Sequence, residues 1–194
     1  DQKETWCVVK ELGETTYKEF DNALRRVFLL LLSLAEEILE SLNKGVKKDI
    51  LKSAHLIDTN IDRFTDYCLR VLNKKGYKDY RKTPTIHSII FLLEIVGDEF
   101  RKIAVHLMEA KTISAQTEEL FKIRYNQLRG FYELFYNFSN KKCLEIYEMD
   151  NGPHHYTEEV FEGLTNDEKE ILHHLKKIRV FLNNITHLRI DLEY

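Results

Sequence analysis

Two pairs of acidic residues have the spacing of one helical turn. Asp58 and Asp62 form one pair, and Glu94 and Asp98 form the other. Side chains four residues apart on a helix lie on the same face, so the two carboxylates of each pair are neighbours. Glu94 is the only charged residue in the run 88–97, and a carboxylate in an apolar surface is costly unless something compensates it. Two such pairs favour a site over a solvated helix face.

Convergence of the two pairs would create a metal site. If their helices pack face to face, four carboxylates meet. We expect no cationic side chain of the motifs to neutralise them. Such a cluster favours raised pKa values or bound cations. Oxygen ligands suit hard cations or iron, so the metal is expected to be iron, zinc, manganese or magnesium. The predicted ligands are Asp58, Asp62, Glu94 and Asp98, with Asp66 and Glu99 as outer candidates.

Histidine-based metal sites fit the sequence less well. A di-metal enzyme of the ferritin-like kind needs two Glu-x-x-His pairs and two more glutamates. Only Glu170 and His173 have that spacing, and no His-Glu-x-x-His motif is present. We therefore expect no enzymatic activity, with the ferritin-like enzyme as the alternative and a structural bundle with a solvated acidic face as a third hypothesis. His55, one turn before Asp58, is the one histidine expected near the cluster. The remaining candidates are interpreted as surface residues: His154, His155, His173, His174 and His187.

The rest of the chain predicts an all-α protein. Of its 194 residues 43% are hydrophobic and 31% charged, with only 7 Gly and 2 Pro, which is typical of a soluble helical protein. Apolar residues at helical spacing predict helices over about 16–45, 47–75, 83–110, from 115 onward, a shorter one interrupted at 151–153, and 165–192. Thr16 and Thr165 each begin a capping-box pattern, and Thr83 is a predicted N-cap before Pro84. The seven aromatic residues of the fourth helix are expected to fill the core.

The first fourteen residues differ from the helical part. The stretch 5–12 is rich in strand formers, and a lone strand cannot be stable. We interpret 1–14 as a strand and linker left from an upstream domain, or as an arm that packs on the helices. Because the first residue is Asp1 rather than Met, we expect the chain to be part of a longer protein.

Cysteine usage and hydropathy predict a cytoplasmic protein. Cys7, Cys68 and Cys143 are odd in number and lack a Cys-x-x-Cys spacing, which indicates a reducing compartment. The longest apolar stretch, 27–35, is far shorter than the roughly 20 residues of a membrane span, so no membrane insertion is expected. A net charge of −3 gives no general case for nucleic-acid binding.

The helices divide into two similar halves. Thr83 and Thr165 are both predicted helix starts, and at that offset the apolar pattern of the third helix falls on that of the last one. Lys176 then takes the place of Glu94, and Val180 that of Asp98. The sequence therefore predicts two three-helix repeats, 15–111 and 112–194, of which only the first carries the acidic residues.

These motifs resemble those of the PhoU-like phosphate uptake regulators. Asp58-Thr-Asn-Ile-Asp62 looks like the first signature of that family, and Glu94-Ile-Val-Gly-Asp98 looks like the second. The resemblance implies a bundle of two three-helix repeats with metal clusters on its surface. It also implies a regulator of phosphate uptake that contacts a phosphate transporter or signalling protein, with a homodimer as the expected assembly. In the archaeal branch an AbrB-like DNA-binding domain often comes first, so contact with DNA, and a part in transcription, is expected only through such a domain.

Overall fold

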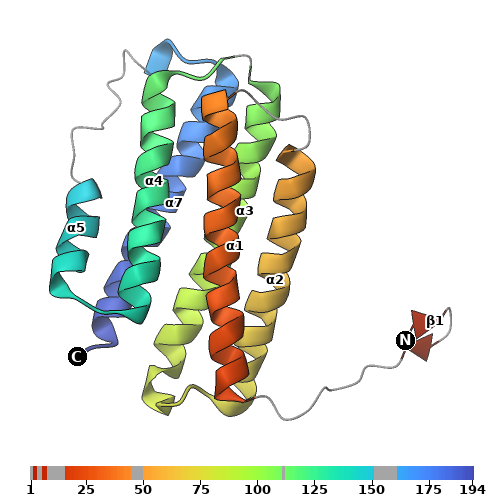
Figure 1. The fold of residues 1–194 in the computed structure, drawn as a ribbon, viewed down its shortest axis with the longest axis vertical. Coiled ribbons are helices and arrows are strands. Elements are labelled where there is room, and N and C mark those ends of the chain that lie inside the picture. Colours follow the sequence, from red (N-terminus) through yellow and green to blue (C-terminus); the bar gives the residue numbers. More distant parts are fainter. Residues whose placement is uncertain (1, 4–5, 8–15, 45–49, 111, 151–160) are drawn as a thin grey trace.

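The computed structural model describes residues 2–3, 6–7, 16–44, 50–110, 112–150 and 161–194, and six α-helices have defined bounds within them. They form one elongated bundle with its long helices side by side (Figure 1). Five are long: α1 (Tyr17–Lys44), α2 (Ile50–Lys75), α3 (Thr83–Glu109), α4 (Ala115–Tyr136) and α7 (Asn166–Asp191). The shorter α5 (Asn140–Asp150) lies beside α4, and a 3₁₀ turn, η1 (Tyr80–Lys82), leads into α3. The predicted all-α bundle is confirmed.

The structure describes only part of the stretch predicted as an N-terminal strand. Only Trp6–Cys7 of the stretch 5–12 has a described conformation, as strand β2. It pairs antiparallel with β1, Gln2–Lys3, four residues earlier in the chain. The remaining residues of that stretch lie outside the described residues.

Local sequence signals explain most helix starts. The capping box of α1 is present, because the Thr16 N–H donates to Glu19 Oε2 at 2.8 Å and the Glu19 N–H donates to Thr16 Oγ1 at 3.2 Å. The predicted N-cap at Thr83 is wrong. Since η1 runs directly into α3, Thr83 is already helical, and its Oγ1 accepts from the Tyr77 N–H at 2.9 Å. The Thr83 hydroxyl thus connects the preceding loop to α3 and does not cap the helix.

The second capping box is only half formed, and its other half joins two helices. Thr165 Oγ1 accepts from the Glu168 N–H at 3.3 Å, as the pattern predicts. The buried Glu168 carboxylate instead accepts from the Ser114 N–H at 2.8 Å and from Thr117 Oγ1 at 2.7 Å. The start of α7 is thereby fixed to the start of α4.

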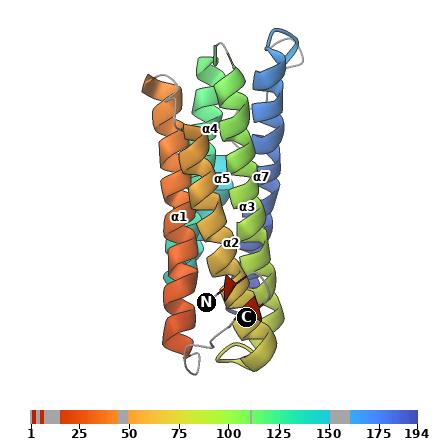
Figure 2. The same ribbon diagram turned by 90° about the vertical axis from the view of Figure 1, so that its right-hand side faces the viewer.

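Helix α3 lies at the centre of the bundle and packs against α1, α2 and α7 (Figure 2). Gly97 allows the closest of these contacts, because a Cβ there would lie 3.3 Å from Ile61 Cδ1 and 3.3 Å from Leu31 Cδ2. The close approach predicted for this glycine is therefore one of helix packing. The aromatic residues of α4 are core, as predicted: Phe28 of α1 is fully buried against Phe131, Tyr132, Phe135 and Tyr136.

The two predicted repeats remain an interpretation of this helix order. Helices α1, α2 and α3 fall within 15–111, and α4, α5 and α7 fall within 112–194. The second group differs most at α5, which has 11 residues where α2 has 26. None of the described helices is long and apolar enough to cross a membrane.

Candidate metal centre

Helices α2 and α3 place the predicted acidic residues along one seam. Asp58 on α2 is buried, with 6% of its surface exposed, and Asp62 further along α2 is exposed. Glu94 and Asp98 on α3 are half-buried. Burial raises the pKa of the Asp58 carboxyl, and so do Asp62 on the same helix and Asp98 across the seam, so the two pairs lie close enough to interact. We name these four residues, together with the exposed Asp66, the acidic row.

The acidic row carries negative charge that its surroundings only partly offset. Burial raises the pKa of Glu94 first, and repulsion from Asp62, Asp98, Asp66 and Asp58 raises it further. Burial and the neighbouring acids likewise raise the pKa values of Asp58 and Asp62. At neutral pH, repulsion between the ionised carboxylates therefore destabilises the row, and a bound cation would reduce this repulsion.

Cations do reach the row, contrary to the expectation that nothing matches the carboxylates. Besides Arg101, Lys102 Nζ lies 3.9 Å from Asp98 Oδ2, and Arg70 Nη2 lies 4.0 Å from Asp66 Oδ2. Arg101 Nε lies 2.7 Å from Asp58 Oδ2, and its Nη2 lies 3.2 Å from Asp98 Oδ1. Its position three residues after Asp98 on the same helix was the signal in the sequence. Arg101 leaves Asp58 Oδ1 buried without a hydrogen-bond partner among the described residues. Glu94 has only carboxylates among the charged groups that shift its pKa.

The predicted outer ligand Glu99 lies apart from the row. Its side chain is buried, with 3% of the residue exposed, and it faces α7. Glu99 Oε1 accepts from Lys102 Nζ at 2.8 Å, and Oε2 lies 2.6 Å from His174 Nδ1 and 3.6 Å from Lys177 Nζ. Burial alone would raise the pKa of Glu99, but the hydrogen bonds from Lys102 and His174 bring it below its usual range. Glu99 therefore belongs to a buried charged network between α3 and α7.

The positions of the histidines agree only in part with the prediction. His55 lies near the row as expected, since its charge lowers the pKa of both Asp58 and Asp62. His174, interpreted from the sequence as a surface residue, is buried and bonded to Glu99. Burial lowers the pKa of His174 even though Glu99 opposes that shift. His173 beside it is exposed, so the prediction fits only that residue of the doublet.

The oxygen atoms of the row suit hard cations, but they are not gathered around a single ion position. Carboxylate oxygens are the ligands that such cations prefer, and Asp58 Oδ1 is a buried oxygen without a partner in the described structure. Within the described residues, the tight groups of possible ligand atoms involve α3 and α7 instead. Side chains of the row must therefore rotate toward a shared ion.

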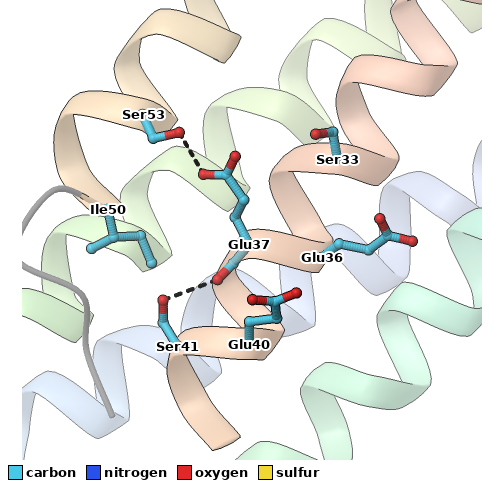
Figure 3. Close-up of a pocket in the computed structure, with 7 residues that line it drawn as sticks. All are labelled: Ser33, Glu36, Glu37, Glu40, Ser41, Ile50 and Ser53. Carbon is cyan, nitrogen blue, oxygen red and sulfur yellow. Dashed lines mark hydrogen bonds between the residues drawn. The ribbon is translucent and has the colours of Figure 1, made fainter. Parts of the chain in front are cut away.

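A second acidic feature lies at the end of the bundle where α1 ends and α2 begins. A cavity of about 400 Å³ there is lined by Ser33, Glu36, Glu37, Glu40, Ser41, Ile50 and Ser53 (Figure 3). Ser53 Oγ donates to Glu37 Oε2 at 2.5 Å, and Glu36 accepts from the Tyr125 hydroxyl. Glu37 and Glu36 therefore join α1 to α2 and to α4 by hydrogen bonds.

The described helices form an all-α bundle with a PhoU-like fold. Among solved structures the chain is similar to the crystal structure of the phosphate transport system regulatory protein PhoU from Streptococcus pneumoniae. The two share 20% sequence identity at a TM-score of 0.71, over 91% of this chain and 94% of that chain. No family model matches the chain, and no match is found among curated proteins. The structural likeness establishes the fold that the acidic motifs predicted.

Proposed function

We propose that this protein regulates phosphate uptake and acts through contacts of a metal-bearing helical bundle. The observation that carries the proposal is the likeness of fold to a phosphate transport regulatory protein, which extends over 91% of this chain and 94% of that one. That solved structure is described as a regulatory protein of a transport system, which supports a role of the same kind for this chain. We therefore propose a regulatory and non-enzymatic role.

The acidic row is the proposed metal site of this regulator. Asp58, Asp62, Glu94 and Asp98 supply oxygens from two neighbouring helices, and Asp66 extends the row. Repulsion among them disfavours the ionised row without a cation, so binding would add bonds and remove a penalty together. Bound ions would also fix α2 against α3, which gives a partner protein a surface of defined shape and charge.

The partner we propose is a phosphate transporter or signalling protein. A homodimer, and contact with DNA through an AbrB-like domain outside this sequence, remain predictions from the family resemblance. No step of the proposed role requires a group on this chain to react.

Deleting the coding gene in the source organism tests the proposal. Phosphate uptake, measured with labelled phosphate in phosphate-rich medium, should lose its restraint and increase. The wild-type gene should restore regulation, and the variant Glu94→Gln/Asp98→Asn should not. A matched variant, Glu145→Gln/Glu148→Gln, removes the same charge from the exposed face of α5 and should restore regulation. Unchanged uptake and unchanged phosphate-responsive transcription after deletion would contradict the proposed function.

A further inference from the structure

A second cluster of possible metal ligands lies between the end of α3 and the start of α7, at the upper end of the bundle in Figure 1. It consists of His106 from α3 and of Glu170 and His174 from α7. One ligand atom from each residue lies within 4.8 Å of the other two. Glu170 and His174 are four residues apart, so the helix itself places them side by side.

Glu99 binds one ring nitrogen of His174 and thereby fixes the position of the imidazole. His174 Nδ1 lies 2.6 Å from Glu99 Oε2, and the other oxygen of that carboxylate accepts from Lys102 Nζ at 2.8 Å. Metal-binding histidines typically donate one ring N–H to a carboxylate, which fixes the tautomer and leaves the second nitrogen free to bind. Glu99 would therefore act as a positioning residue for His174 Nε2.

His106 brings an imidazole whose hydrogen-bonding capacity is not fully used. Its ring stacks on that of His174, with centroids 5.5 Å apart and planes inclined by 26°. Its Nδ1 is buried without a hydrogen-bond partner among the described residues, and Asp167 Oδ1 lies 3.9 Å from it. Glu170 is exposed, so an ion could reach the two imidazoles from solvent past its carboxylate.

We propose that His106, Glu170 and His174 bind a divalent transition-metal ion, with zinc as the best match. Two imidazoles and one carboxylate form a known three-ligand set for zinc, which leaves a fourth position for water or an anionic oxygen. Ligand atoms around tetrahedral zinc lie roughly 3.3 Å apart, given bonds of about 2.0–2.1 Å. Small side-chain rotations therefore close the site. This nitrogen-containing site differs in ligands and position from the all-oxygen acidic row.

A competing set shares one of these ligands. His106, Glu109 and Asp167 also offer three atoms within 4.8 Å of one another. Only the set with His174 includes a histidine that a buried carboxylate already orients. That difference selects Glu170 over Glu109 as the carboxylate ligand.

Calorimetric titration of the full chain with zinc tests the proposal. Because the acidic row could also take up zinc, the titration is made both in the wild type and in Glu94→Gln/Asp98→Asn, and the proposed site should bind one equivalent in each. Adding Glu170→Gln should weaken this binding at least tenfold. His173→Gln, an exposed neighbour on α7, is the matched control and should change nothing. Far-UV circular dichroism checks that each variant keeps its helices.

Three results would overturn the assignment. The first is zinc affinity in Glu170→Gln equal to that of the parent protein. The second is loss of affinity in Glu109→Gln with Glu170→Gln unaffected, which would move the ion to the competing set. The third is the absence of a zinc equivalent in Glu94→Gln/Asp98→Asn. None of these results depends on phosphate regulation or on the metal content of the acidic row.

Discussion

Replacing Glu94 with glutamine should stabilise the metal-free protein at neutral pH. Glu94 is half-buried, and the charged groups that shift its pKa are all carboxylates, with Asp62 and Asp98 the strongest. A like-charge pair one helical turn apart costs about 0.2–0.5 kcal/mol. Asp98 supplies one such pair, and Asp62 across the seam supplies a comparable repulsion. The expected gain in the free energy of unfolding is about 0.5–1 kcal/mol at low ionic strength.

The pH dependence of this gain has a definite sign. The folded-state pKa of Glu94 is raised above its unfolded value, so ionisation costs the folded state more than the unfolded state. Below the unfolded value, near 4.3, both states are protonated and the penalty is absent. It develops as the pH rises from the unfolded value toward the folded pKa, and it is complete above the folded pKa. The stabilisation by Glu94→Gln should therefore be largest at neutral pH and vanish toward pH 4.

Urea denaturation with a chelator present measures this effect. In low salt at pH 7, Glu94→Gln should have the higher unfolding free energy, and molar salt should remove most of the difference because it screens the row. Glu145→Gln on exposed α5, whose carboxylate lies 3.6 Å from Lys141 Nζ, is the control and should not stabilise. A lower stability of Glu94→Gln in low salt, or a gain that salt leaves unchanged, would refute the repulsion.

Three further substitutions probe contacts around the row and in the core. Arg101→Gln should lower the unfolding free energy by about 1–3 kcal/mol because it leaves the buried Asp58 unpaired, and Asp58→Asn in the same chain should recover much of the loss in a double-mutant cycle. Glu99→Gln should cost about 2–4 kcal/mol in urea denaturation and should lower the pKa of His174 further, as followed by NMR titration. Phe28→Ala should cost about 3–5 kcal/mol in thermal or urea denaturation, because its fully buried ring contacts four aromatic rings of α4.

Features that depend on neighbours along the chain were predictable from the sequence. The capping box at Thr16 is formed by two groups three residues apart, so the pattern contains the whole interaction. Helical spacing likewise fixes the two members of each acidic pair, whereas the approach of the two pairs depends on the packing of α2 against α3. Thr83 departs from its pattern because η1 supplies the preceding turn, so its hydroxyl binds the Tyr77 N–H instead.

Features that depend on helices distant in the chain were not predictable. The Glu168 carboxylate binds at the start of α4, 54 residues from Ser114, where its own capping box predicts a local partner. Glu99 and His174 are 75 residues apart, and only the packing of α3 on α7 joins them. The sequence predicts surface positions for both His173 and His174, but α7 places His174 on its buried side.

The metal content of the acidic row tests the central proposal most directly. The full chain is incubated with iron or manganese, freed of unbound metal by gel filtration, and analysed for bound metal per chain. The wild type and the control Glu145→Gln/Glu148→Gln should retain the same metal content, and Glu94→Gln/Asp98→Asn should retain less, by the amount that the row binds. Equal metal content in the wild type and in Glu94→Gln/Asp98→Asn would contradict the proposal and show that the row is a solvated face of the bundle.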